Sequence, residues 1–242
     1  MSAKIIVSYD GTANEDDAIA LGALFARAGA DLALAYVRHN HEPDSDRETL
    51  AQHEAQELLE RGAALLGKRR QDQSTIGLHV VTDRSTPEGL AVLAERQGAA
   101  AIVFCSDSHT AVGHVSIGNS AERLLEGGRS AVAIAPVGLA DRTLGGGSAG
   151  PTLQRIVAVG EPGAGSAEAT AEGLARALGA TVSPVASNEA DLLVIDSRPD
   201  AEQGRISISS AATHLIETAT CPVLVLPRGV ALQIGGTQAV TA

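Results

Sequence analysis

Two short segments carry residues that could bind a polar ligand. Asp10 stands at the end of the strand-like run Lys4 to Ser8, where its carboxylate can accept a hydrogen bond from an amino or hydroxyl group. Gly118-Asn119-Ser120 opens a predicted helix, so its backbone amides can hold an anion. Simpler roles fit both segments, because Asp10 can cap the helix that starts near Asn14, and Asn119 or Ser120 can cap the later helix. The residue types leave both interpretations open.

Other residues that could do chemistry have a more ordinary explanation. His39-Asn40-His41, with Asp44 and Asp46 nearby, could form a metal loop, but we interpret it as a polar surface loop and predict no metal site. Cys105 could be a redox thiol near a helix N-terminus, although a small buried residue explains it better. The sequence contains no recognisable set of nucleophile, base and orienting group. We therefore predict no catalytic residues.

The composition narrows the class of protein. Apolar residues make up 44% of the chain and charged residues 19%, which is typical of a folded globular protein. The 18 basic and 29 acidic residues give a net charge of −11, which opposes binding to nucleic acid. The two cysteines lie far apart, which favours a reducing compartment. Met1 to Lys4 leads directly into a strand without a long apolar run, so we expect a cytoplasmic protein with no membrane partner.

Short aliphatic runs alternate with segments of helical period in the first half. This pattern is typical of βαβ units around a parallel sheet. The predicted strands are Lys4 to Ser8, Asp31 to Val37, Leu78 to Thr82, Ala100 to Cys105 and Ala131 to Ala135. The predicted helices lie near Glu15 to Ala28, Arg47 to Arg69, Thr86 to Arg96 and Asn119 to Glu126.

The second half of the chain repeats the first with a deletion. Val115 to Ala121 aligns without a gap on Ile206 to Ala212, at an offset of 91 residues (206 − 115) that continues to Pro136 and Pro227. Lys4 to Val7 matches Arg155 to Ala158 at an offset of 151 residues (155 − 4). The second copy is therefore shorter by 60 residues (151 − 91), and the deletion falls after its second strand.

An open parallel sheet can lose a strand at its edge and still pair. With the strand order 3-2-1-4-5, the missing third strand is an edge strand, so we expect an α/β chain with two doubly wound parallel-sheet domains, the second trimmed. The remaining elements of that copy are predicted at Arg155 to Gly160, Ser166 to Leu178, Thr181 to Val185, Asp191 to Asp196, Ser210 to Thr218 and Val223 to Leu226. The predicted boundaries are 1–139 for the complete domain, 140–152 for a Gly/Ser-rich linker, 153–230 for the trimmed domain and 231–242 for a flexible tail.

Two stretches of the first half resemble one protein family. Lys4 to Thr12 (KIIVSYDGT) is similar to the opening of universal stress proteins. Ile102 to Pro136, which contains GNSAERLL from Gly118 to Leu125, is similar to their closing strand, loop, helix and strand. The resemblance implies a Rossmann-like fold of the adenine nucleotide alpha hydrolase type. It also implies a tandem form in which the last strands of the two domains, Ala131 to Ala135 and Val223 to Leu226, pair as an intramolecular pseudo-dimer. A further homodimer is left open.

The resemblance implies a ligand as well. ATP-binding members of the family carry a loop of the form G-x2-G-x9-G-S/T, in which Cys105 and Ser108 stand here at the first two glycine positions and Asn119 at the Ser/Thr position. A Cβ at those places would crowd a phosphate. By resemblance, an adenine nucleotide such as ATP would be bound by Asp10, Val37, Ser106, Gly118, Asn119 and Ser120, with Mg²⁺ present only alongside a nucleotide.

The second copy departs further from this loop, since Asp196 stands in place of Cys105 and Ser209 in place of Gly118. A carboxylate there would repel phosphate, so we interpret the second copy as structural. We therefore expect a stress-response protein, not an enzyme, whose first domain binds an adenine nucleotide. A scaffold with a degenerate pocket is the main alternative. An adenylate-forming or phosphoryl-transferring enzyme is disfavoured, because the turn from Asp10 to Asp17 is acidic where such enzymes carry glycines or bases.

Overall fold

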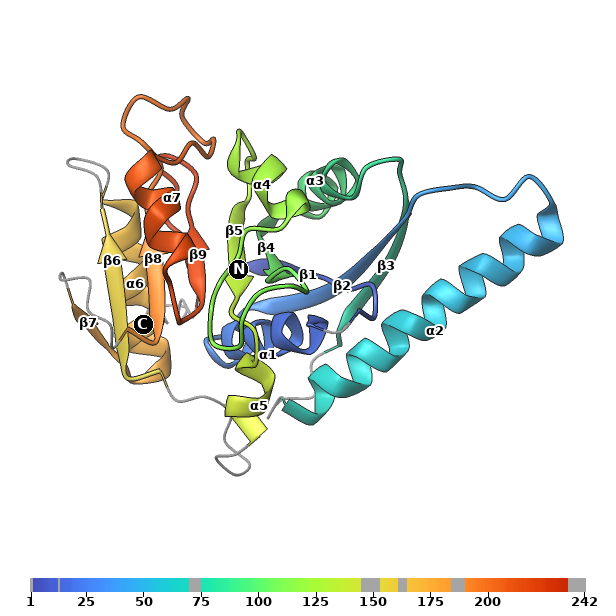
Figure 1. The fold of residues 1–242 in the computed structure, drawn as a ribbon, viewed down its shortest axis with the longest axis horizontal. Coiled ribbons are helices and arrows are strands. Elements are labelled where there is room, and N and C mark those ends of the chain that lie inside the picture. The colour runs from blue at the N-terminus through green and yellow to red at the C-terminus, as the bar shows by residue number, and fades with distance from the viewer. Residues whose placement is uncertain are drawn as a thin grey trace, which may run out of the picture.

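Nine strands and seven helices occupy the part of the chain that a computed structural model describes, residues 2–12, 14–69, 75–144, 153–160, 165–183 and 190–234. The strands are β1 (Lys4–Ser8), β2 (Asp31–Arg38), β3 (Gly77–Thr82), β4 (Ala99–Cys105), β5 (Ala131–Ala135), β6 (Arg155–Val159), β7 (Thr181–Ser183), β8 (Leu192–Ile195) and β9 (Val223–Val225). The helices are α1 (Glu15–Arg27), α2 (Ser45–Arg69), α3 (Thr86–Gln97), α4 (Asn119–Leu125), α5 (Leu139–Leu144), α6 (Ser166–Leu178) and α7 (Ser210–Glu217), shown in Figure 1.

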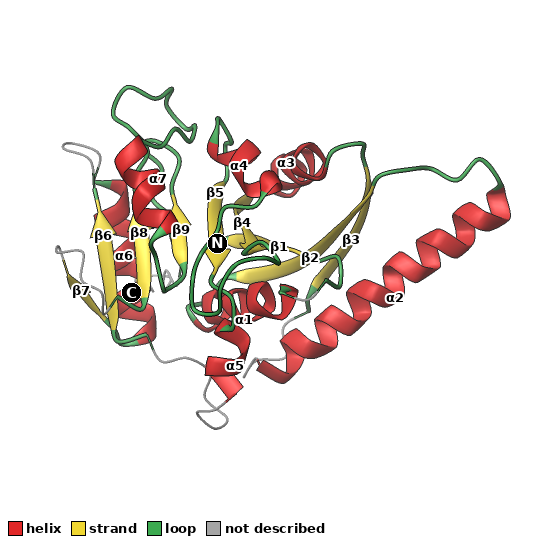
Figure 2. Cartoon of the chain, viewed as in Figure 1, coloured by secondary structure: helices red, strands yellow, loops and turns green. Residues whose placement is uncertain are grey.

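These strands form a single sheet in the order β3-β2-β1-β4-β5-β9-β8-β6-β7, with helices on both faces (Figure 2). Neighbouring strands are parallel except β5 and β9, which are antiparallel, with Ala133 opposite Leu224. The predicted α/β class, the order 3-2-1-4-5 in the first half and the pairing of the last strands are confirmed. Because β5 and β9 pair, the two predicted sheets are continuous.

The strand order of the second half follows that of the first. The strands β7-β6-β8-β9 occupy the same relative places as β2-β1-β4-β5. Only residues 184–191 separate β7 from β8, whereas a long helix, a strand and a further helix separate β2 from β4. The described residues of the second half therefore contain no counterpart of α2, β3 or α3.

Two loop hydrogen bonds cross between the halves in a reciprocal manner. The amide of Val115 donates to the carbonyl of Ala219 at 3.0 Å, and the amide of Ile206 donates to the carbonyl of Gly128 at 2.8 Å. Ile206 follows Val115, and Ala219 follows Gly128, by the same offset that the sequence repeat has. Such an exchange, in which each partner uses the same two groups, is the pattern of a twofold interface.

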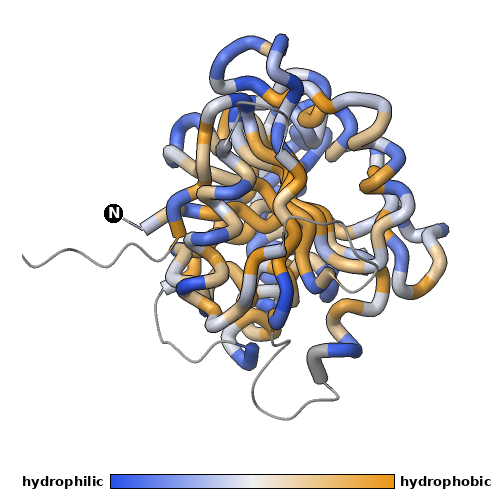
Figure 3. Tube along the Cα trace, turned by 90° about the vertical axis from the view of Figure 1, so that its left-hand side faces the viewer, coloured by the Kyte–Doolittle hydropathy of each residue, from blue (hydrophilic) through white to orange (hydrophobic). Residues whose placement is uncertain are grey.

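The hydrophobic core lies in two layers, one on each face of the sheet, and each layer runs through both halves. One layer joins side chains of α1, α2, α5 and α6, and the other joins side chains of α3, α4 and α7. Figure 3 shows the hydrophobic residues concentrated along the strands in the middle of the molecule. Because the layers are continuous, each half buries apolar surface that the other covers.

Helix α2 packs over the turn that follows β1. A Cβ atom at Gly11 would lie 2.6 Å from Leu58 Cδ1, and the φ angle of Gly11 is +80°. The left-handed backbone favours glycine here, and a Cβ atom would have to displace the end of the Leu58 side chain. Helix α2 therefore lies in contact with the turn that begins with Asp10.

The structure places ordered residues inside two of the predicted boundary segments. The predicted linker 140–152 begins inside helix α5, which Asp17 holds by accepting hydrogen bonds from the amides of Gly138 at 2.8 Å and Ala140 at 2.7 Å. Within the predicted tail 231–242, Leu232 is buried and its amide donates to Thr170 Oγ1 at 2.9 Å. Local sequence patterns do not indicate such long-range contacts. The Gly/Ser-rich stretch 145–150 and residues 235–242 lie outside the described residues.

The shared sheet and cores predict that the second half depends on the first. A fragment of residues 151–242 would expose β9, whose Leu224 and Val225 are fully buried in the whole chain. We expect no cooperative thermal transition for this fragment by circular dichroism, whereas residues 1–144, which keep five strands and their covering helices, should melt cooperatively. A cooperative melt of the isolated 151–242 fragment would contradict this dependence.

Candidate functional site

The strand order reverses between β1 and β4, and the segments that follow these strands meet there. The two strands pair in parallel, so their carboxyl ends lie at the same edge of the sheet, where doubly wound folds bind ligands. The side-chain amide of Asn14 spans the two segments and donates to the carbonyls of Ser106 at 3.3 Å and Asp107 at 3.1 Å. Sequence reasoning treated Asn14 only as a helix start and missed this bridge.

Glu15 fills the turn next to Asp10. Its carboxyl group accepts from the amide of Gly11 at 2.6 Å and from the amide of Asp10, and the residue is only 4% exposed. Burial, followed by the charge of Asp10, raises the pKa of Glu15 to about 8. The chain thus places its own acid on two backbone amides that a ligand anion could otherwise reach.

Asp10 itself remains exposed at the mouth of the turn. Its carboxylate accepts a hydrogen bond from the amide of Thr12 at 3.0 Å. Asn14 occupies the N-cap position of α1, and no side chain caps that helix. Of the two roles left open by the sequence, Asp10 therefore does not cap α1, and its carboxylate lies beside the carboxyl group of Glu15.

Two of the predicted ligand residues are buried in the fold. Ser106 donates its hydroxyl to the carbonyl of Ala135 at 2.6 Å and accepts from the amide of Ser116 at 3.1 Å. Val37 is 6% exposed and lies under α3, where a Cβ atom at Gly89 would be 3.1 Å from Val37 Cγ1. Their present contacts are structural.

The second half repeats the contacts of Ser106. Ser197 donates its hydroxyl to the carbonyl of Leu226 at 2.6 Å and accepts from the amide of Ser207 at 3.2 Å. In each half, one buried serine directly follows a strand, β4 or β8. Its hydroxyl group links this strand to the end of the neighbouring strand, β5 or β9, and to the loop that follows. The loops after β4 and β8 are thereby held in the same way.

The start of α4 differs from the start of α7. Gly118 is the N-cap of α4 with an extended backbone (φ −74°, ψ 159°) and no capping side chain, so the exposed Asn119 and the half-buried Ser120 begin that helix uncapped. In α7, Ser209 occupies the corresponding position and accepts from the amide of Ala212 at 3.2 Å. The two crevices therefore differ in the hydrogen-bond donors that they leave available.

The corresponding strand end of the second half carries a buried acid. Asp196, which follows β8, is 4% exposed, and a Cβ atom at Gly160 would lie 3.5 Å from its Oδ2. The residues aligned with Asp10 and Gly11, positions 161 and 162, lie outside the described residues. A buried carboxylate at this place makes the second crevice unfavourable for a phosphate.

Burial keeps both cysteine thiols protonated near neutral pH, and His39 and His41 lie beside polar partners. Burial, reinforced for Cys105 by Glu15 and Asp10, raises the pKa of both Cys105 and Cys221 to about 12. His39 Nε2 lies 3.4 Å from Thr86 Oγ1, and His41 lies beside Glu48. Within the ranges that the structure describes, no three His, Cys, Asp or Glu side chains gather as a metal site would require.

The strand order and the helices on both faces of the sheet define a Rossmann-like α/β protein. The model of the universal stress protein family matches residues 1–136, and the chain belongs to this family. No curated protein matches the sequence. No helix among the described residues is long and apolar enough to cross a bilayer.

Solved structures share the fold across both halves of the chain. A universal stress protein from Archaeoglobus fulgidus is 13% identical, with a TM-score of 0.64, and the match covers 95% of this chain and 100% of that one. A provisionally assigned universal stress protein from Pseudomonas aeruginosa is 14% identical, with a TM-score of 0.60 and 94% of each chain covered. A functionally unknown protein from the same species is 13% identical, with a TM-score of 0.59 and coverages of 94% and 93%. At such low identity the likeness concerns the fold.

The buried Glu15 carboxyl predicts a pH-dependent stability. With its pKa raised from 4.5 to about 8, the folded chain retains a proton that the unfolded chain releases, so the free energy of unfolding should fall as the pH rises between these values. The glutamine of Glu15→Gln stays neutral at every pH. This variant should therefore lack the decrease in the free energy of unfolding, roughly 2 kcal/mol or more, that wild type shows. Urea denaturation from about pH 5 to pH 8 measures it, with the exposed Glu168→Gln as control. Equal pH slopes in wild type and Glu15→Gln would refute the assignment.

Proposed function

We propose that this chain is a stress-response protein of the cytoplasm that acts by binding and not by turnover. It consists of a complete universal stress protein domain fused to a trimmed second copy, which serves as its built-in dimer partner. The matched strand orders, the equivalent contacts of Ser106 and Ser197, and the reciprocal bonds of Val115 and Ile206 support this interpretation. The net charge of −11 argues against nucleic acid as a partner.

The first domain, in this proposal, binds one adenine nucleotide between Asp10 and the start of α4. The observation that carries the assignment is the difference between the two crevices. The first presents the exposed carboxylate of Asp10 and an uncapped helix start at Gly118, whereas the second presents the buried Asp196 and a helix capped by Ser209. Mg²⁺ would enter only with the nucleotide.

A scaffold that binds no nucleotide is the second candidate. The carboxyl of Glu15 and the amide of Asn14 already satisfy backbone groups at the switch point, so the chain needs no ligand to complete this region. Ser106 and Val37, which the family resemblance assigns to a ligand, are used internally. In this reading the crevice is a remnant of the fold.

Two possible nucleophiles near the switch point, Ser106 and Cys105, are held in unreactive states. The Ser106 hydroxyl is engaged with Ala135 and Ser116, and the raised pKa of Cys105 keeps that thiol protonated near neutral pH. A protonated thiol is a weak nucleophile. We therefore propose that the chain signals through conformation or partner contact.

Calorimetric titration with ATP, ADP and AMP tests this function. Wild type should bind one nucleotide per chain. The double variant Asp10→Ala with Gly118→Val should bind at least about tenfold more weakly, because it loses the Asp10 carboxylate as an acceptor and places methyl groups over the backbone amides at the start of α4. The space around Gly118 is open and its φ is negative, so valine there should not disturb folding.

Ser209→Gly provides the matched control in the second crevice and should leave the binding unchanged. Two equivalent sites, or unchanged binding in the double variant, would refute the single-site assignment. A complete lack of binding for all three nucleotides would favour the scaffold.

A further inference from the structure

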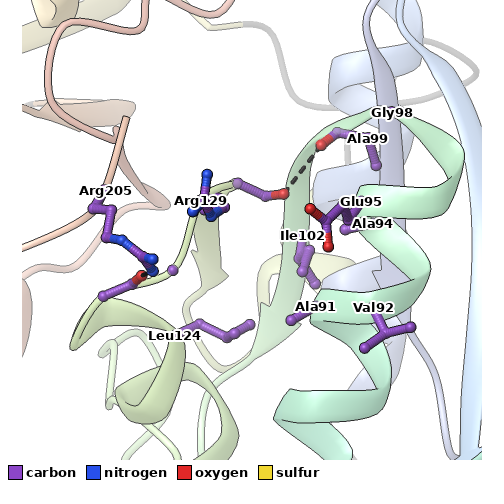
Figure 4. A pocket seen from close by; sticks show the side chains of 13 residues that line it. Ala91, Val92, Ala94, Glu95, Gly98, Ala99, Ile102, Leu124, Arg129 and Arg205 are labelled. Atoms are coloured by element: carbon purple, nitrogen blue, oxygen red, sulfur yellow. Dashed lines mark hydrogen bonds between the residues drawn. The ribbon is translucent and has the colours of Figure 1, made fainter. Parts of the chain in front are cut away.

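A hollow lies between α3, α4 and a loop of the second half, away from the crevice at the switch point. It has a volume of about 370 Å³ and is lined by Ala94, Ile102 and Leu124, among others (Figure 4). An adjoining hollow of about 490 Å³ shares Ala91, Leu124 and Arg205 with it and extends toward Pro87. The volume of each lies in the range of small-molecule sites.

The turn after α4 forms part of the lining of this hollow. Gly127 has a φ of +140°, and a Cβ atom at Gly128 would lie 2.4 Å from the carbonyl oxygen of Leu124. Glycine is therefore required at both positions, and the wall that they form is backbone without side chains. The carbonyl of Gly127 accepts a hydrogen bond from Arg205 at 2.9 Å, so the second half completes the wall.

The hollow has one cationic side over an apolar floor. In Figure 4, Arg129 and Arg205 lie on one side, the α3 residues Ala91 and Glu95 lie on the other, and Leu124 lies between them. The exposed Arg129 has no hydrogen bond or ion pair with the part of the chain that the structure describes. Arg205 pairs with the exposed Glu202 at 2.9 Å, an interaction that is weak in water.

We propose that this hollow is a binding site for a small amphipathic carboxylate, distinct from the nucleotide crevice. The aliphatic body would lie along the exposed Ala91 and Val92 beside Leu124, and the carboxylate would lie against the guanidinium of Arg129, with Arg205 beside it. A planar guanidinium matches a carboxylate in shape and charge. Because Arg205 comes from the second half, the site exists only when the two halves are assembled.

Calorimetric titration of the full chain with octanoate tests the proposal, with 1-octanol as the neutral probe. Octanoate should bind more tightly than octanol. Arg129→Gln should weaken the binding of octanoate by about three- to tenfold and leave the binding of octanol unchanged, because only the charged contact is lost. Ala91→Leu places a larger side chain on the exposed wall and should weaken both probes. Glu95→Gln removes a like charge and should strengthen octanoate.

Arg176→Gln, an exposed substitution on α6, is the matched control for net charge and should change nothing. Saturating ATP should leave octanoate binding intact, so the failure of one site is distinguishable from the failure of the other. The proposal is overturned if octanoate does not bind at millimolar concentration, if octanol binds equally well, or if Arg129→Gln and Arg176→Gln behave alike. Thermal melts of each variant establish that a lost signal comes from the site and not from unfolding.

Discussion

The antiparallel pairing of β5 with β9 joins the two halves of this molecule into one sheet. A sheet of five or four strands leaves an edge whose backbone groups need a partner, and here each half supplies the partner of the other. The pairing also aligns the two core layers, so the short second half shares the apolar burial of the larger first half. The second half, which contributes four strands and two described helices, thus gains both a strand partner and apolar cover from the first.

In each half, a single loop connects the switch point to the interface between the halves. These are the loops after β4 and β8. The loop after β4 begins at Ser106, which borders the crevice, and reaches Val115, whose amide bonds to the second half. The loop after β8 repeats this course from Ser197 to Ile206. A ligand that moves the start of one loop would therefore act directly on a bond between the halves. Conformational signalling needs such a shared element, and it requires no catalytic group.

The sequence predicts most of the fold because its signals are local. Aliphatic runs such as Ala131 to Ala135 and the ungapped repeat locate strands, and the strand order follows from the rules of parallel sheets. The site is harder, since a residue type does not say which partner it meets. Ser106 and Val37 resemble ligand residues but are held inside, whereas Glu15 and Asn14, read as helix-start residues, fill the switch point. Helix α5 and buried Leu232 likewise depend on distant partners, Asp17 and Thr170.

Native-state hydrogen exchange at the amides of Val115 and Ile206 tests the joined-halves account most directly. Both amides are buried and donate across the interface between the halves, so they should exchange slowly and with matched protection, near the free energy of global unfolding. The exposed Ser108, in the same loop as Val115, gives the rate expected without such protection. If Val115 and Ile206 exchange as fast as Ser108, or if one is protected and the other is not, the halves are not joined as a reciprocal pair.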